Sequence, residues 1–179
     1  MQITGPNGQV ADVDFENRVK TFAVTQPEDK HINLEGGTHS IYFTVTPAGA
    51  NDYFYYLKNT GVSDLYITDI RIKSTVVTDI YYEYVSGTPT YTTGTATGDV
   101  TRNLGSARSL SVESKYDTDI TGLTSLGVLF FECCAAANTR YKLSTSSNVI
   151  IPQGKAIAFK REAATGVIEA LVSVVDSAS

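Results

Sequence analysis

Apolar side chains gather in four strand-length runs between His39 and Val85, and short clusters of turn residues separate these runs. The runs read HSIYFTVT, YFYYLKN, LYITDIRI and TDIYYEYV, with Gly, Pro, Asn, Asp or Ser between them. This arrangement is typical of consecutive β-strands joined by tight turns. The sequence contains no amphipathic helical pattern of about 12 residues. The pattern therefore predicts an all-β protein.

Two of these runs predict further detail. In Tyr53–Leu57 apolar residues occupy both faces. We therefore expect a strand covered on one side by a facing sheet and on the other by the N-terminal arm or a neighbouring subunit. In Leu65–Ile72 the parity of the apolar positions changes at Thr68 and Asp69. Such a change of phase within one strand predicts a β-bulge.

The second half of the chain divides into shorter segments. The Thr- and Gly-rich stretch Ser86–Asp99 predicts an exposed hairpin or loop. Further segments are expected to be a weak strand at Ser109–Val112, a turn at Gly122–Gly127, and strands at Val128–Cys134, Arg140–Leu143 and Asn148–Ile151. Ala156–Lys160 and Val167–Val175 are expected to pair with each other as the closing strands.

This spacing predicts the architecture of the body. Roughly nine to ten strands with turns every 8–15 residues or so favour two antiparallel sheets packed face to face. A parallel sheet would need helical segments between its strands, and the pattern contains none. We expect an antiparallel two-sheet β-sandwich, and within this class a jelly roll.

The first 37 residues differ in pattern from the rest. They are mostly polar, with a turn or flexible start before residue 12 and a short strand expected at Val19–Val24. Their few apolar anchors cannot form a core of their own, so they must pack against other protein surface. We expect an N-terminal arm over residues 1–37 and a single β-sandwich domain over residues 38–179. The arm's predicted partner-binding residues are Val13, Phe15, Val19 and Phe22.

Composition and charge narrow the classes of function. The net charge is −5, and the 14 Lys and Arg residues are scattered along the chain. Nucleic-acid binding usually requires a concentrated basic field, so we expect no nucleic-acid partner. No apolar run approaches the roughly 20 residues of a membrane-spanning helix, and the first residues lack the pattern of a secretory signal. We expect a protein that is made and used without export.

The sequence also lacks a convincing catalytic or metal-binding set. Glu83 and Glu132 both lie in apolar strands, and a pair of carboxyl groups facing each other could hydrolyse glycosides. A glutamate at the outward position of a half-buried strand is much more common. His31 and His39 have no paired cysteines, which makes a poor metal site. We therefore expect no enzyme, no metal and no cofactor.

Other candidate residues have structural explanations. Asp12, Asp14 and Glu16 alternate in a way that could hold calcium, but solvated loop charges are the more common role. Of the adjacent cysteines Cys133 and Cys134, we expect one to be buried as a small apolar residue and the other to be partly covered.

Eleven tyrosines and no tryptophan leave three roles open for the aromatic strands. The tyrosines of Tyr53–Tyr56 and Tyr81–Tyr84 could pack across strands in the core. They could also form a subunit interface, since tyrosine combines an apolar ring with a polar tip. A third possibility is a platform on which sugar rings stack, to which Tyr91 could contribute.

Two segments of the chain resemble structural proteins of tailed bacteriophages. The arm resembles openings of the pattern V-D-x-x-N-R-L-x-V-x-A-V-T, which falls here on Val13, Asp14, Asn17, Arg18, Val19, Ala23, Val24 and Thr25. Two positions depart from it, because Val19 replaces Leu and Thr21 replaces the next Val. The body segments YFYYLKNTGVSDLYITDIRI and NVIIPQGKAIAFKREAATG are similar to β-sandwich proteins of phage heads and tails.

The resemblance implies a non-enzymatic virion protein. Its leading role would be head decoration, in which a cement protein binds the capsid surface and stabilises it. The expected partners are the major capsid protein or another virion protein, together with copies of the chain itself in a homotrimer. Such a protein is made in the host cytoplasm and located on the particle surface. The alternatives are a tail, baseplate or fibre component, or a carbohydrate-binding module for receptor recognition.

Overall fold

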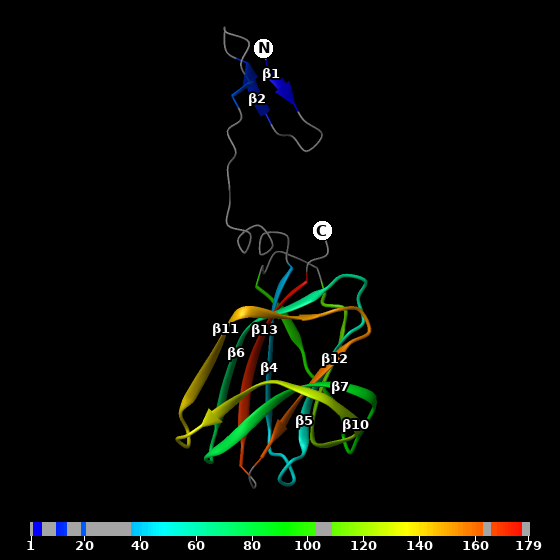
Figure 1. Ribbon diagram of the computed structural model, residues 1–179, viewed down its shortest axis with the longest axis vertical. Helices are drawn as coiled ribbons and strands as arrows, with labels where there is room; N and C mark the ends of the chain where they lie inside the picture. The colour runs from blue at the N-terminus through cyan, green and yellow to red at the C-terminus, as the bar shows by residue number, and fades with distance from the viewer. Residues whose placement is uncertain are drawn as a thin grey trace. The chain divides into compact units, whose positions relative to one another are not determined.

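The computed structural model describes residues 2–4, 10–13, 19–20, 37–102, 109–162 and 166–176 (Figure 1). The chain divides into two compact units, Met1–His31 and Ile32–Ser179. The expected boundary between arm and body after residue 37 stays a prediction.

The first unit contains three short antiparallel strands. They are β1 (Gln2–Thr4), β2 (Val10–Val13) and β3 (Val19–Lys20), with β2 in the middle. Asp12 lies opposite both Gln2 and Lys20. The expected strand at Val19–Val24 is described only over β3, and β1 and β2 replace the turn or flexible start that the sequence predicted. Strands of two to four residues are too short to show a clear alternation, so the pattern did not reveal them.

The second unit is built from two five-stranded antiparallel sheets. The first, called the β4 sheet, has the order β11-β6-β13-β4-β9. Its strands are β4 (Thr38–Val45), β6 (Leu65–Ser74), β9 (Asp99–Thr101), β11 (Arg140–Ile151) and β13 (Ile168–Asp176). The β-bulge predicted near Thr68 is confirmed. Ser173 pairs with Asp69 and Val174 with Ile67, so that Thr68 is the extra residue.

The second sheet, called the β5 sheet, has the order β5-β12-β7-β10-β8. Its strands are β5 (Tyr53–Asn59), β7 (Thr78–Tyr91), β8 (Thr95–Ala96), β10 (Val112–Cys134) and β12 (Ala156–Arg161). The long strand β10 also pairs with β5 through its first half. Because β10 reaches both β5 and β7, it bends around the outer side of this sheet.

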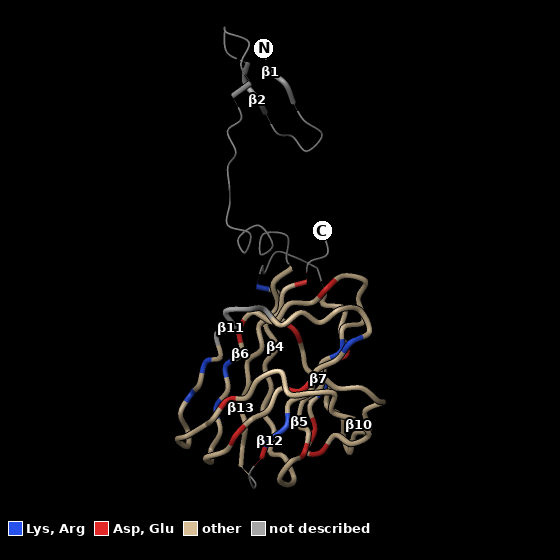
Figure 2. The backbone as a smooth tube through the Cα atoms, viewed as in Figure 1, with Lys and Arg blue, Asp and Glu red and all other residues tan. Residues whose placement is uncertain are grey.

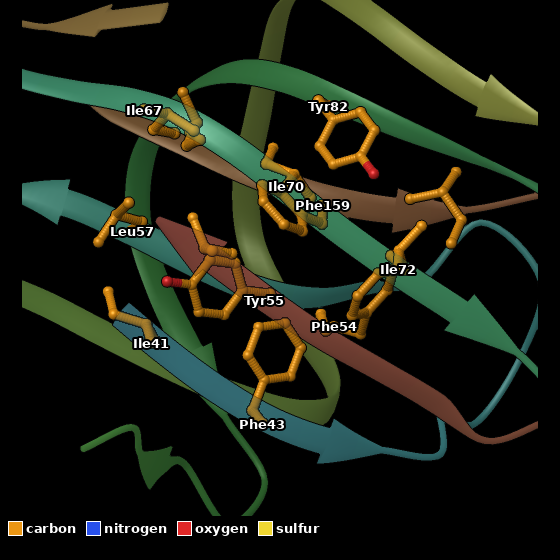
Figure 3. Packing of buried hydrophobic residues seen from close by; sticks show 14 of the residues in the cluster. Ile41, Phe43, Phe54, Tyr55, Leu57, Ile67, Ile70, Ile72, Tyr82 and Phe159 are labelled. Carbon is orange, nitrogen blue, oxygen red and sulfur yellow. The ribbon is translucent and has the colours of Figure 1, made fainter. Parts of the chain in front are cut away.

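The two sheets pack face to face, so the predicted all-β antiparallel sandwich is confirmed. Aromatic rings fill the space between them (Figure 3). The Phe43 ring stacks on Tyr55 with centroids 4.4 Å apart, and the Tyr82 ring meets Phe159 edge-on at 4.6 Å. Such aromatic pairs contribute about 0.5–1.5 kcal/mol each beyond their buried area.

Strand β5 is buried on both faces, as its sequence predicted, but the covering element is different. A second apolar cluster forms on its outer side from Tyr56, Val85, Ile120, Ala156 and Ala158. Within one chain, the bent strand β10 supplies this cover through Ile120. The small side chains of β12 leave the space that β10 needs. Neither the arm nor a neighbouring subunit is required to bury β5.

The prediction of a turn at Gly122–Gly127 is wrong, because strand β10 continues through these residues. A single strand runs from Val112 to Cys134, so it includes the expected strand at Val128–Cys134 but only the last residue of the one expected at Ser109–Val112. Gly122 has φ +75°, and a Cβ there would lie 2.5 Å from the carbonyl oxygen of Thr88. Glycine therefore permits the strand to bend where the pattern suggested that it ended.

Three further predictions are changed by the fold. The expected short strands at Arg140–Leu143 and Asn148–Ile151 are parts of one strand, β11, with a register irregularity between them. The expected closing pair separates, because β12 lies in the β5 sheet and β13 in the β4 sheet. Part of the expected hairpin or loop at Ser86–Asp99 forms the end of β7 and the whole of β8.

Asp117 ties the turn after β7 to β10. Its buried carboxylate accepts hydrogen bonds from the backbone of Thr93 (2.9 Å), Gly94 (3.0 Å) and Thr118 (2.7 Å). Burial acts to raise the pKa of Asp117, but these donors outweigh burial and hold the pKa below its usual value. The charged form is therefore the stabilising one.

We expect Asp117→Asn to lower the free energy of unfolding by about 1–3 kcal/mol at neutral pH, because the amide cannot accept all of these hydrogen bonds. Since the folded pKa lies below the unfolded value of about 3.9, the contribution of Asp117 is present above that value and is lost as pH falls. Urea denaturation between pH 3 and pH 7 measures both effects.

Asp119→Asn is the matched control for this prediction. The pKa of Asp119 is raised, first by burial and then by the charges of Asp52 and Asp117. Its charged form is therefore disfavoured in the folded state, and the substitution should leave stability at neutral pH unchanged or slightly increased. Equal losses in the two variants would contradict the role assigned to Asp117.

Candidate functional site

The second half of β10 exposes a short stretch of large apolar side chains, which we call the β10 surface. Its members and their exposed fractions are Leu126 (53%), Val128 (52%), Leu129 (46%) and Phe131 (60%). Nine large apolar side chains are exposed in the described part of the chain, and these four lie within six residues. Such clustering marks an interaction site more strongly than scattered exposure does.

Backbone irregularities produce this exposure. Ser125 pairs with Val85 and Gly127 with Tyr84, which leaves Leu126 as an extra residue on β10. In the same way, Leu129 is the extra residue between Val128 and Phe130. A bulge re-aims the side chain of its extra residue and increases the local twist. With regular pairing, Leu126 and Leu129 would point to opposite faces of the sheet. The bulges instead leave both side chains exposed to solvent.

The free edge of β10 has few of the features that normally prevent an edge strand from pairing with another chain. Among the described residues, β10 beyond Ile120 pairs only with β7, so its other edge is open. The sequence from Ile120 to Thr139 contains no Lys, Arg or Pro, and Glu132 is its single charged residue. Exposed edge strands normally carry charges or proline that prevent association. Here only the bulges oppose strand pairing, and the exposed side chains favour contact with another protein.

A buried polar cluster lies beneath the β10 surface. The Glu83 side chain is almost fully buried, and one of its carboxylate oxygens lies 2.5 Å from Nζ of Lys160. The hydroxyl of Tyr53 donates a hydrogen bond to the other oxygen at 2.5 Å. Nζ of Lys160 also lies 5.6 Å from the ring centroids of Tyr53 and Tyr81.

The electrostatics of this cluster favour a charged carboxylate. Burial acts to raise the pKa of Glu83, but hydrogen bonds from Lys160, Tyr53 and Ser125 outweigh burial, and the pKa is lowered. Burial and the neighbouring carboxylate raise the pKa of Tyr53, so its hydroxyl stays a donor. Because Ser125 belongs to β10 next to Leu126, the cluster holds the β10 surface against β7 and β12.

Carboxylates border one end of the β10 surface. The Phe131 and Tyr81 rings lie with centroids 6.0 Å apart on the outer side of the sheet. Glu162 and Asp79 both act electrostatically on Tyr81 and, after burial, raise its pKa. The surface therefore combines an apolar stretch with an acidic border.

The structure separates the two glutamates that the sequence suggested as a catalytic pair. Glu132 lies opposite Ile80, whose side chain points into the core between the sheets. Glu83 lies three residues further along β7 and shares the outer face with Tyr81 and Val85. Side chains directly opposite each other in an antiparallel pair share a face. The two carboxyl groups therefore point to opposite faces of the β5 sheet and cannot flank one substrate.

Half of the tyrosines in the two tyrosine-rich segments pack in the core. Tyr55, Tyr56 and Tyr82 are buried, whereas Tyr53, Tyr81 and Tyr84 are partly exposed. Of the two cysteines, Cys134 is buried as predicted, whereas Cys133 is exposed rather than partly covered.

Of the two histidines that the sequence analysis considered and rejected as metal ligands, one lies in the described part of the chain. His39 is buried, and its Nδ1 lies 2.9 Å from a carboxylate oxygen of Asp99 without hydrogen-bond geometry. His31 lies outside the described residues. No group of three or more His, Cys, Asp or Glu side chains among the described residues is arranged to hold a metal ion.

The predicted partner-binding residues of the arm are only partly placed. Val13 ends β2 and Val19 begins β3, while Phe15 and Phe22 lie outside the described residues. Their role stays a prediction. Sequence reasoning missed the β10 surface, because it assigned Gly122–Gly127 to a turn and Val128–Cys134 to a central strand. The signal present in the sequence was the long interval without Lys, Arg or Pro.

In comparisons with known proteins, no family model, curated protein or solved structure matches the chain. Within the described residues, no helix has the length and apolar character needed to cross a membrane.

The buried pair of Glu83 and Lys160 gives a test of how the β10 surface is held. We expect Lys160→Met to lower the free energy of unfolding by about 3 kcal/mol, because it leaves a buried carboxylate without its cation. The effect should lie at the low end for a buried pair, since the Lys160 side chain is 23% exposed. Denaturant unfolding followed by tyrosine fluorescence measures the loss.

The double variant E83L/K160M removes both charges and should be less destabilised than K160M alone. The matched control is Lys155→Met, which alters an exposed lysine in the turn before β12 and should change stability by less than about 0.5 kcal/mol. If the double variant loses as much as the sum of its single variants, the two side chains are not coupled.

Proposed function

We propose that this chain is a non-enzymatic structural protein of a tailed-bacteriophage virion, with head decoration as the favoured role. In this role it binds the capsid surface and stabilises the shell. The observation that carries an assembly function is the β10 surface, an apolar contact site on a rigid sandwich. The assignment to a phage particle rests on the resemblance of the arm and of the two body segments.

The energetics of the β10 surface suit repeated weak contacts. Covering a half-exposed Leu, Val or Phe side chain contributes on the order of 1 kcal/mol, so four of them supply a modest affinity per copy. Many copies on one particle act together, since each bound copy favours the assembled state by mass action. A cement protein needs binding energy of this kind and no chemistry.

The order of the strands supports a jelly roll. One sheet contains β11-β6-β13-β4 and the other β5-β12-β7-β10. In chain order these eight strands alternate between the two sheets, with one exception: β7 and β10 follow each other in the set and pair directly in the same sheet. Two interleaved Greek keys produce this arrangement, which occurs in viral capsid and lectin domains. The proposed class of protein is compatible with that architecture.

The proposed partners are the major capsid protein or another virion protein, and further copies of this chain. The proposed location is the particle surface after synthesis in the host cytoplasm. The expected homotrimer drew support from the two apolar faces of β5, which the fold covers within one chain. A homo-oligomer is now better supported by the β10 surface, and its number of copies stays a prediction. Tail, baseplate and fibre positions use the same kinds of contact.

Carbohydrate recognition has its own structural support as an alternative. An open depression of about 310 Å³ is lined in part by Glu113 and Lys115. Tyr91 lies beside it, donating a hydrogen bond to Glu113 at 3.3 Å while Nζ of Lys115 lies 4.7 Å from the ring centroid. Polar groups beside an aromatic ring are the elements of a sugar site. Binding on a glycan array that Tyr91→Ala abolishes would favour this function over decoration.

Particles assembled without this protein allow the proposal to be tested. The purified wild-type chain should bind to them and raise the temperature at which they release DNA. The variant L126S/L129S should bind at least about tenfold more weakly, because two apolar contacts are lost. Sedimentation of particles with labelled protein measures binding, and electron microscopy shows whether the label lies on the head.

The variant V13S/F15S/V19S/F22S tests the arm in the same assay, and V62S/V77S is the control because it alters exposed valines elsewhere. Both test variants must retain the wild-type thermal transition. Label on the tail would replace decoration by a tail role. Absence of the wild-type chain from all particles would contradict the virion assignment.

A further inference from the structure

The outer face of the β4 sheet carries four cations in two cross-strand pairs. Arg140 of β11 lies opposite Lys73 of β6, and Lys142 lies opposite Arg71. Figure 2 shows blue segments, which mark Lys and Arg, on the neighbouring strands β11 and β6. Adjacent strands are about 4.8 Å apart, and alternate residues along a strand are about 6.8 Å apart. We call this compact arrangement the cationic face.

Like charges directly opposite each other destabilise a strand pair. Two carboxylates neutralise the cationic face in part. Asp69 lies 2.8 Å from Nε of Arg71 and 3.9 Å from Nζ of Lys142, and Glu169 lies 3.2 Å from Nζ of Lys73. A surplus of positive charge remains there, in a chain whose net charge is −5. Folding alone does not explain why this acidic chain places its cations opposite one another.

The cationic face is continuous with apolar side chains, of which the outermost is exposed. Lys142, Arg71, Leu171 and Tyr42 form one row across four strands, because each lies opposite the next. Tyr42, at the end of this row, is 59% exposed. The face therefore changes from cationic at the β11 edge to apolar at β4.

The β10 surface is complementary in charge to this face. It too is apolar along most of its length. Two acidic residues border its end, because Asp79 pairs with Cys133 and the backbone N–H of Glu162 donates a hydrogen bond to the carbonyl of Asp79. One cation, Lys160, lies over the Tyr81 ring beside them, and it is already paired with Glu83. Apolar contact flanked by opposite charges sets the register and partner of an interface.

We propose that the partner on the β10 surface is a second copy of this chain, which presents its cationic face. Asp79 and Glu162 of one copy lie against Arg140 and Lys142 of the next, and the apolar stretch Leu126–Phe131 packs toward Tyr42. This inference rests on the proposed function in one respect only: the proposed function leads us to expect a homo-oligomer. The contact is heterologous, since different surfaces of the two copies meet, so it forms a ring or an open stack.

A polyanion such as nucleic acid is a less suitable occupant. It would meet the cationic face but would be repelled by the rest of an acidic chain, and it would leave the β10 surface exposed. The second copy covers both surfaces with one contact. It also explains why the apolar stretch has an acidic border.

Charge reversal on β11 separates assembly from folding. The variant R140E/K142E places glutamates opposite Lys73 and Arg71, which turns two repulsive cross-strand pairs into attractive ones. Its thermal stability as a monomer should therefore be equal to or higher than that of the wild type. Its self-association should weaken by at least about 100-fold, because like charges then meet across the interface. Sedimentation velocity over a range of protein concentrations measures the fractions of monomer and of associated protein.

Reversal of the acidic border completes the experiment. The variant D79K/E162K should also be monomeric, and the combined variant R140E/K142E/D79K/E162K should assemble again, since both surfaces have exchanged charge. Lys155→Glu is the control and should assemble as the wild type does. Association of the wild type should weaken as salt is raised from 0.1 M to 1 M or so, because salt screens charges near the surface.

Three results would overturn the inference. The wild-type chain could remain monomeric at the highest concentration, the four-site variant could fail to reassemble although it folds, or R140E/K142E could assemble as the wild type does. In the last case, loss of assembly in L126S/L129S would show that β10 surfaces contact each other. Particle binding by a monomeric R140E/K142E chain would leave the proposed function in place and count against this inference alone.

Discussion

The structure depends on the long strand β10, which pairs with β5 and β8 near its start and with β7 along the rest of its length. The first half of β10 is hydrogen-bonded to β5 and the second half to β7, and Ile120 lies opposite residues of both strands. Such a strand must bend sharply, and its backbone can do so at Gly122 because no Cβ meets the carbonyl of Thr88. The bend buries the outer side of β5 and β12 and creates a second apolar cluster. It also leaves the far edge of β10 open, where the exposed leucines lie.

The polar groups beneath this bend follow from the same geometry. When β10 covers the outer side of the sheet, Glu83 is removed from water and must be paired. Lys160 and Tyr53 supply a cation and a donor from two neighbouring strands, and Ser125 supplies a donor from β10 itself. The cluster therefore joins four strands, β5, β7, β10 and β12, at the point where the apolar surface begins. An apolar contact site is useful for assembly only if its backbone is rigid, and this network provides that rigidity.

The two outer sides of the sandwich differ in charge and in apolar character, so the molecule has two distinct surfaces. One side carries the cationic face on β6 and β11, and the other carries the apolar stretch of β10 with its acidic border. A surface that is complementary to a different surface of the same molecule supports head-to-tail association. In a decoration protein, such contacts between copies would add to each copy's contact with the shell. The resemblance of the arm and the asymmetry of the body therefore support a common role in assembly.

The class of the fold and several local features could be predicted from the residues alone. Alternation of apolar residues in the runs from His39 to Val85 predicted the strands, and the change of phase at Thr68 predicted the bulge, because both depend on side-chain parity within a single strand. The two-sided burial of β5 was also visible in its residues. What covers that strand, how β10 bends and which sheet receives β12 or β13 were decided only by the tertiary structure. Glycine-rich stretches are compatible with either a turn or a bent strand, and contacts distant in sequence select between the two. The β10 surface and the cationic face arise for the same reason, since each depends on residues that pairing between distant strands brings together.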